Sequence, residues 1–289
     1  MDFKEENIQI DGTRIHYVTC GSGPPIVLVH GLTNNWKGYV PLASFLGKTN
    51  TLYIPDLPGY GDSGQLPHYS VEIMSKYVQK FVRAIGVEQP VPIMGLSMGG
   101  FIVADFTKTY PDLVSRLVVM GPVLQDCKRK GDIVMHMLMG IDRIPGGRFI
   151  LKKIIETRTY GYLSSKYINM YKVNMPLIDL YGSVGRKKMT KDVYMEMFTA
   201  AHAYDLEETL SGVRVPTLLL YGREDRISGP ARAEQHLLAR NNNLSLGVIP
   251  QAGHVVCFEK AEESAMAIVS FLSYGNAFTL KPRFVQERQ

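Results

Sequence analysis

The chain has 289 residues, and its 45% hydrophobic content is enough to bury a substantial core, as one large domain or as a core domain with an insertion. Its 32 Lys and Arg against 27 Asp and Glu leave a net charge of +5, spread along the sequence, which gives no case for a nucleic-acid partner. The three cysteines, Cys20, Cys127 and Cys257, are too few and too scattered for a disulfide framework or a zinc site, and they indicate a reducing compartment.

The sequence carries no signal for export or for a membrane span. Its first residues lack the apolar run of a signal peptide, and no later segment approaches the roughly 18 apolar residues of a span. We therefore expect a cytoplasmic protein without stable membrane insertion, as a monomer or homodimer. The most basic stretches are expected to be solvated surface: 128–130, 186–188 and the tail from Lys281.

The first predicted elements are two antiparallel strands. Apolar residues alternate through 8–10 and 15–19 on either side of Asp11-Gly12, a dipeptide typical of a tight hairpin turn. Pro25 then precedes 26–29, a continuous apolar run with the β-branched content of a strand buried on both faces. Comparable runs predict further strands at 51–54, 91–94, 117–120, 217–221 and 244–249.

Helical patterns separate several of these strands. The clearest spans 71–85, where apolar residues recur three and four positions apart before Gly86, a typical C-terminal cap. Others start near Met98, Pro230 and Glu262. Strand followed by helix, repeated, predicts an α/β fold with a mostly parallel sheet and helices on both faces.

The alternation breaks between residues 123 and 212. This stretch holds 8 of the 14 methionines and 7 of the 16 tyrosines, and it shows short helical patterns without buried-strand runs. We interpret 123–212 as an inserted helical cap, and 1–122 together with 213–289 as the core domain.

The motif Gly95-Leu96-Ser97-Met98-Gly99 stands directly after a predicted strand and directly before a predicted helix, the context that makes Gly-x-Ser-x-Gly a nucleophile turn. A serine on so tight a turn needs small neighbours, which Gly95 and Gly99 provide. The predicted nucleophile is Ser97, and the amide of Met98 at the start of the helix is a predicted oxyanion donor.

A serine hydroxyl needs a base, and the base needs an acid that orients it. Of seven histidines, His254 is the one that follows the last predicted strand, where a loop returns over the same edge of the sheet as Ser97. Asp225, after the strand at 217–221, is the predicted acid. It is preferred to the adjacent Glu224, whose side chain points elsewhere, while Asp126 is a weaker substitute.

The loop after the strand at 26–29 is expected to complete the oxyanion hole. His30 and Gly31 begin it, and the amide of Leu32 is the predicted second donor. We expect His30 to brace the loop through hydrogen bonds rather than to transfer protons. Trp36, the one tryptophan, lines the acyl pocket in one reading and packs into the core in the other.

From about residue 8 to residue 271 the sequence resembles the α/β-hydrolase superfamily. The resemblance rests on five motifs in the family's order: His30-Gly31, Asp56-Leu57-Pro58-Gly59-Tyr60-Gly61-Asp62-Ser63, Gly95-Leu96-Ser97-Met98-Gly99-Gly100, Gly222-Arg223-Glu224-Asp225 and Ala252-Gly253-His254. It implies an eight-stranded core sheet with a cap inserted after the sixth strand.

The resemblance also implies a class of reaction. Haloalkane dehalogenases and epoxide hydrolases of this fold carry an aspartate where Ser97 stands, which disfavours both. We expect an esterase or lipase-like enzyme with a small-molecule ester substrate and no cofactor or metal. Lactones, amides and the carbon–carbon bond of a ring-cleavage product remain alternatives, and for the last a pocket arginine is expected from Arg143, Arg148, Arg158 or Arg186. A non-catalytic binding module is the rival from another class.

Overall fold

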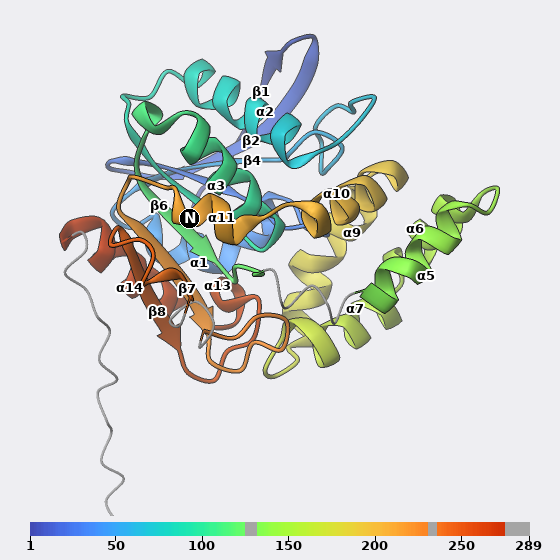
Figure 1. The fold of residues 1–289 in the computed structure, drawn as a ribbon. Coiled ribbons are helices and arrows are strands. Elements are labelled where there is room, and N and C mark those ends of the chain that lie inside the picture. The colour runs from blue at the N-terminus through green and yellow to red at the C-terminus, as the bar shows by residue number, and fades with distance from the viewer. Residues whose placement is uncertain (125–131, 231–235, 275–289) are drawn as a thin grey trace, which may run out of the picture.

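The computed structural model describes residues 1–124, 132–230 and 236–274 (Figure 1). Its centre is one sheet in the order β1-β2-β4-β3-β5-β6-β7-β8, in which β1, β2 and β4 pair antiparallel and all later neighbours pair parallel. The strands are β1 (Lys4–Ile10), β2 (Thr13–Gly21), β3 (Pro25–Val29), β4 (Thr51–Pro55), β5 (Val91–Leu96), β6 (Val114–Met120), β7 (Thr217–Gly222) and β8 (Leu244–Ile249). The predicted α/β fold with an eight-stranded, mostly parallel sheet is confirmed.

Sixteen helical segments are described. They are η1 (Trp36–Tyr39), α1 (Val40–Leu46), α2 (Val71–Ala84), α3 (Met98–Thr109), η2 (Pro111–Leu113), α5 (Asp132–Asp142), α6 (Gly147–Glu156), α7 (Arg158–Ser164), η4 (Ser165–Asn169), α8 (Met175–Leu177), η5 (Ile178–Gly182), α9 (Ser183–Lys188), α10 (Lys191–Ala203), α11 (Leu206–Ser211), α13 (Val256–Glu259) and α14 (Ala261–Tyr274). Among the helices so described, none has the length and apolar character needed to cross a bilayer.

Two apolar clusters fill the space on the two faces of the sheet. Val27 and Val29 of β3 point into the cluster shared with α2 and α3, while Ile26 and Leu28 point into the cluster shared with α1 and α14. This alternation follows from the two-residue period of a strand, and burial on both faces explains why the predicted strand is an unbroken apolar run.

The local signals for the hairpin and for the first long helix are borne out. Asp11 and Gly12 both have positive φ, as the tight turn between β1 and β2 requires. Helix α2 begins where the Ser70 hydroxyl accepts a hydrogen bond from the Ile73 amide, and it ends before Gly86, whose φ is +68°.

Between β6 and β7 every described element is a helix. In Figure 1 the segment from α5 to α10 lies to one side of the sheet, and the hairpin of α5 and α6 extends farthest from it. Residues 125–131 and 231–235 fall outside the described residues, and so therefore do Asp126, Cys127, the basic run at 128–130 and the first turn of the helix predicted from Pro230. The basic tail from Lys281 lies outside them too.

Candidate active site

Ser97 occupies a strained turn between β5 and α3. Its φ of 52° and ψ of −116° lie in a region that residues with a side chain rarely adopt. The strain is held by two main-chain hydrogen bonds, from the Ser97 amide to Met120 O and from the Gly100 amide to Ser97 O, both 2.8 Å. The turn points the hydroxyl away from the strand axis, at the carboxyl edge of the parallel strands.

Glycine is required on both sides of this turn. A Cβ on Gly95 would lie 2.3 Å from Gly99 O, and a Cβ on Gly99 would lie 2.2 Å from Val29 O. Neither neighbour is a flexible side chain, so neither could move aside. The close approach brings the start of α3 against the end of β3, where the loop of His30, Gly31 and Leu32 begins.

The structure brings the three predicted side chains together. Nε2 of His254 lies 2.8 Å from Ser97 Oγ, and Nδ1 of His254 lies 2.9 Å from Asp225 Oδ2. Because a carboxylate only accepts, Nδ1 carries the proton, and Nε2 is left with a lone pair for the serine hydroxyl. Both side chains of the His254–Asp225 pair are buried.

Asp225 is itself fixed by the turn that follows β7. Its Oδ1 accepts hydrogen bonds from the amides of Ile227 at 2.8 Å and Ser228 at 3.1 Å, which leaves Oδ2 for the imidazole. Glu224 points elsewhere, with Oε2 accepting from the Ala252 amide at 3.1 Å. Asp225 therefore binds the imidazole of His254, while Glu224 binds the main chain of the loop before it.

The loop after β3 lies over the serine. A Cβ on Gly31 would be 3.6 Å from Ser97 Cβ, so the start of this loop lies beside the serine turn. His30 is fully buried, donates from Nδ1 to Gly31 O at 2.9 Å, and accepts at Nε2 from the Leu57 amide at 3.1 Å. Burial lowers the pKa of His30, which keeps the ring neutral in this bracing position.

Trp36 is held in the core. Its side chain is buried in the cluster that includes α1 and α14, 5.4 Å from the ring of Phe3. The amide of Trp36 donates to Asp56 Oδ1 at 2.9 Å. Of the two readings of this residue, the geometry favours packing.

Glu259, which the sequence did not single out, joins the histidine loop to the helical segment. Its Oε1 accepts from the Gly253 amide at 2.7 Å, and its Oε2 accepts from the Tyr171 amide at 2.7 Å and the Lys172 amide at 3.4 Å. Burial raises the pKa of Glu259, although these three hydrogen bonds oppose the rise. One carboxylate thus positions the residue before His254 and fixes the chain after η4.

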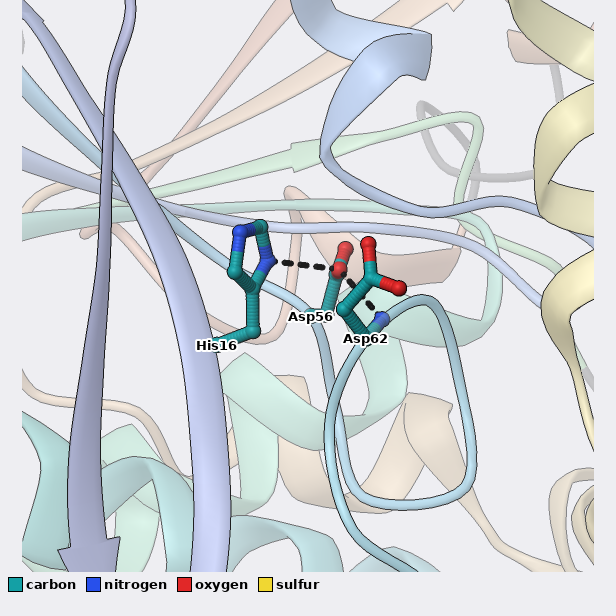
Figure 2. Close-up of side chains that lie close together, drawn as sticks. All are labelled: His16, Asp56 and Asp62. Atoms are coloured by element: carbon teal, nitrogen blue, oxygen red, sulfur yellow. Dashed lines mark hydrogen bonds and ion pairs between the residues drawn. The ribbon is translucent and has the colours of Figure 1, made fainter.

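A second group of titratable residues is formed by His16, Asp56 and Asp62 (Figure 2). Fully buried Asp56 accepts from His16 Nδ1 at 2.9 Å and from the Asp62 amide at 3.0 Å, both at Oδ2. Burial lowers the pKa of His16, but the hydrogen bond to Asp56 and the charge of that residue outweigh it, so the pKa is raised. Asp62 in turn pairs with Lys188.

The atoms of this group that could ligate a metal therefore already have protein partners. The remaining imidazole nitrogen of His16 lies 3.2 Å from Glu5, and Asp56 Oδ1 is taken by the Trp36 amide. We interpret the group as structural, holding the loop 56–63 against β2 and the start of η1.

Comparison with known proteins places this chain in a family. The model of the alpha/beta hydrolase fold matches residues 24–261. Human "Monoacylglycerol lipase ABHD6" is 22% identical over 265 residues, which cover 88% of this chain and 76% of that protein. The "2-hydroxy-6-oxo-6-(2'-aminophenyl)hexa-2,4-dienoic acid hydrolase" of Metapseudomonas resinovorans is 23% identical over 283 residues, covering 94% and 91%.

Among solved structures, a putative lipase from Acinetobacter baumannii AYE superposes with a TM-score of 0.77 at 18% identity, over 94% of this chain and 91% of that one. At this level of identity the likeness concerns the fold. Sequence and structure comparisons thus agree on the architecture.

Proposed function

The chain belongs to the α/β-hydrolase fold family, and on this basis we propose that it is a serine hydrolase that cleaves carboxylic esters of small to medium lipophilic molecules. The observation that carries the proposal is a pair of hydrogen bonds at the imidazole of His254, in which Nδ1 donates to Asp225 and Nε2 accepts from the Ser97 hydroxyl. A purely binding module has no use for the strained serine turn that this pair serves.

The reaction follows from the proton positions. Ser97 Oγ attacks the ester carbonyl carbon while His254 Nε2 takes its proton, and Asp225 stabilises the resulting imidazolium. The negative charge on the carbonyl oxygen is received by the amides of Leu32 and Met98. The imidazolium then protonates the leaving alcohol, which departs as the carbonyl re-forms in an acyl-enzyme.

The second half of the reaction releases the acid. His254 takes a proton from a water that attacks the acyl-enzyme, the same two amides stabilise the oxyanion, and the proton returns to Ser97 Oγ as the acid leaves. Each step uses protein groups and water, so the proposed reaction needs no cofactor or metal.

We further propose that 123–212 forms a cap over the site carried by 1–122 and 213–289. The proposal is supported by two contacts of this segment with loops at the carboxyl edge. A Cβ on Gly185 of α9 would lie 2.7 Å from Thr33 O, directly after Leu32, and the Thr190 amide donates to Gly59 O at 2.8 Å.

The preference for a lipophilic ester rests on the relatives more than on the methionines of this segment. Met170, Met189, Met195 and Met197 are buried in the apolar clusters, where they pack elements together. One relative is named a monoacylglycerol lipase, and its name suggests an acyl ester as the substrate of this chain.

The direct test is labelling by a fluorophosphonate probe. The wild type is expected to be labelled because the probe phosphonylates an activated serine with loss of fluoride, and Ser97→Ala is expected to lose all labelling while its thermal unfolding stays unchanged. A screen of esters with graded acyl length, beside a lactone and an amide, then ranks the substrates. A wild type that resists the probe would instead support the binding-module reading.

Hydrolysis of a carbon–carbon bond is the second candidate, and Arg186 favours it. The side chain of Arg186 is only 6% exposed, and its Nε is buried without a hydrogen-bond partner. Burial lowers its pKa, and among the described residues no carboxylate forms an ion pair with it. A buried guanidinium of this kind is stabilised by an anionic ligand such as a substrate carboxylate.

The other candidate arginines are accounted for differently. Arg148 pairs with Asp142, Asp192 and Glu196, Arg158 pairs with Asp179, and Arg143 is exposed at the turn between α5 and α6. Arg186 is also the neighbour of Gly185, which packs on the loop beside the serine. The relative named as a dienoic acid hydrolase suggests the substrate class for this reading.

Replacing Arg186 with Met separates the two candidates. If the substrate carries a carboxylate, kcat/KM for a dienoic ring-cleavage product is expected to fall about 100-fold, because the anion loses its buried partner. Turnover of p-nitrophenyl butyrate, which has no carboxylate, is expected to stay nearly constant. Arg158→Met, which removes an exposed ion pair, is the matched control; equal losses for both substrates would reject a carboxylate subsite.

A further inference from the structure

Large apolar side chains are exposed mainly in one stretch of the chain. Eleven of the fourteen exposed large hydrophobic residues in the described part of the chain lie between 137 and 180: Met137, Met139, Ile144, Phe149, Ile150, Ile154, Tyr162, Leu163, Tyr167, Tyr171 and Leu180. We call this set the apolar outer face. Scattered apolar residues are ordinary on a protein surface, but a concentration of this kind marks a surface that meets a partner.

Helix α6 has apolar side chains on its outward side as well as on its inward side. Its inward side chains, Leu151 and Ile155, are buried against the rest of the protein, as expected for a helix on a domain surface. Its outward side chains should then be polar, yet Phe149 is 58% exposed, and Ile150 and Ile154 are exposed one turn apart. A helix that is apolar on both sides is expected to bury both sides, so the outward side of α6 is expected to contact a partner.

Positive charge accompanies the apolar outer face. Residues 132–190 contain ten Lys and Arg against four Asp and Glu, a formal net charge of +6, while the whole chain has +5. Three of these ten cations do not add to the exposed charge, since Lys152 and Arg186 are buried and Lys188 pairs with Asp62. The expectation that the positive charge is spread along the sequence is therefore wrong. Three of the four acidic residues form ion pairs within this stretch. Asp142 pairs with Arg148, and Asp179 pairs with Arg158. Glu156 pairs with both Lys152 and Lys153.

Cations are interleaved with exposed rings. The ammonium of Lys153 lies 5.6 Å from the ring centre of Phe149, and that of Lys166 lies 5.6 and 5.1 Å from those of Tyr162 and Tyr167. Within the described residues no carboxylate pairs with Lys166. Aromatic rings beside Lys and Arg suit the boundary between lipid headgroups and acyl chains, where the rings bury apolar area and the cations meet phosphates.

We propose that the apolar outer face docks on an anionic lipid bilayer, with α6 in the plane of the interface. The hairpin of α5 and α6 stands farthest from the sheet in Figure 1, so it can reach a flat surface without obstruction from the core. The net positive charge selects an anionic surface. It also disfavours a second copy of the chain as the occupant, because two such faces would repel each other. This docking does not rest on the proposed reaction, since Ser97→Ala retains the whole surface.

The test is co-sedimentation of the full chain with vesicles. Binding is expected to vesicles of equimolar phosphatidylcholine and phosphatidylserine, to weaken with added salt, and to be at least tenfold weaker with phosphatidylcholine alone, because Lys and Arg contribute through headgroup charge. Ser97→Ala should bind as the wild type does. If docking fails while the fluorophosphonate probe still labels Ser97, only the docking proposal falls.

The double variant Phe149→Ser/Ile150→Ser is expected to bind the mixed vesicles at least tenfold more weakly, because it removes apolar area that would enter the interface. Met266→Ser is the matched control, since Met266 is 68% exposed on α14, a helix that lies far from α5 and α6 in Figure 1. Both variants should hydrolyse a water-soluble ester at the wild-type rate, which excludes unfolding. Equal vesicle binding by both variants, or a wild-type dimer that the double variant dissociates in sedimentation velocity, would overturn the proposal.

Discussion

Asp225→Asn is expected to lower kcat for ester hydrolysis by about 10⁴-fold while leaving the fold intact. Asn can still accept the amides of Ile227 and Ser228 at its carbonyl oxygen, so the turn after β7 is retained. Its NH₂ group then faces His254 Nδ1 and makes that nitrogen an acceptor. The proton moves to Nε2, which can no longer take the proton of Ser97. Steady-state kinetics with a p-nitrophenyl ester and thermal unfolding of the same sample measure the two effects.

Glu224→Gln is the control for this variant. It removes a charge at the adjacent position but keeps an oxygen for the Ala252 amide, so kcat is expected to change by less than about fivefold. The reverse ranking of the two variants would identify Glu224 as the acid. A small loss in both would move the acid to another strand end, with Asp126 as the next residue to replace.

Asp56→Ala is expected to reduce the free energy of unfolding by about 3 to 5 kcal/mol. The carboxylate is fully buried, and its removal leaves the amides of Trp36 and Asp62 without an acceptor and His16 without its counter-charge. Buried polar groups that lose their partner bear the full cost of desolvation. The midpoint of urea denaturation, followed by tryptophan fluorescence, measures the loss, and Trp36 reports directly on this region.

Asp62→Ala provides the matched comparison. The Asp62 carboxylate pairs with Lys188, and both side chains are more than a third exposed, so the loss is expected to be below about 1 kcal/mol. The amide of Asp62 still donates to Asp56 in this variant. If the two alanine variants were equally destabilised, Asp56 would not be the centre of the network.

The sequence predicted the sheet because its strands carry a local signal. A strand buried on both faces must be apolar at every position, so β3 and β7 stand out as unbroken runs, and the turn at Asp11 and Gly12 follows from local chemistry alone. What no local pattern contains is the pairing of β2 with β4, which joins residues 30 or more positions apart.

The site was predictable where its function needs a particular residue type in a particular turn. Gly95, Ser97 and Gly99 are such a case, since the geometry excludes a Cβ on either side of the serine. Asp56 and Glu259 are the opposite case. Their partners lie up to 40 and 88 positions away, and any Asp in a polar loop or Glu before a helix looks the same in the sequence.

The link made by Glu259 bears on how substrate preference can diverge among relatives of this chain. Its partners at 171 and 172 are main-chain amides, so they persist whatever side chains stand there, proline excepted. Mutations in this part of the chain can therefore change substrate preference while the imidazole of His254 keeps its position beside Ser97. Glu259 therefore connects this part of the chain to the catalytic histidine, yet side chains at 171 and 172 can change without loss of that connection.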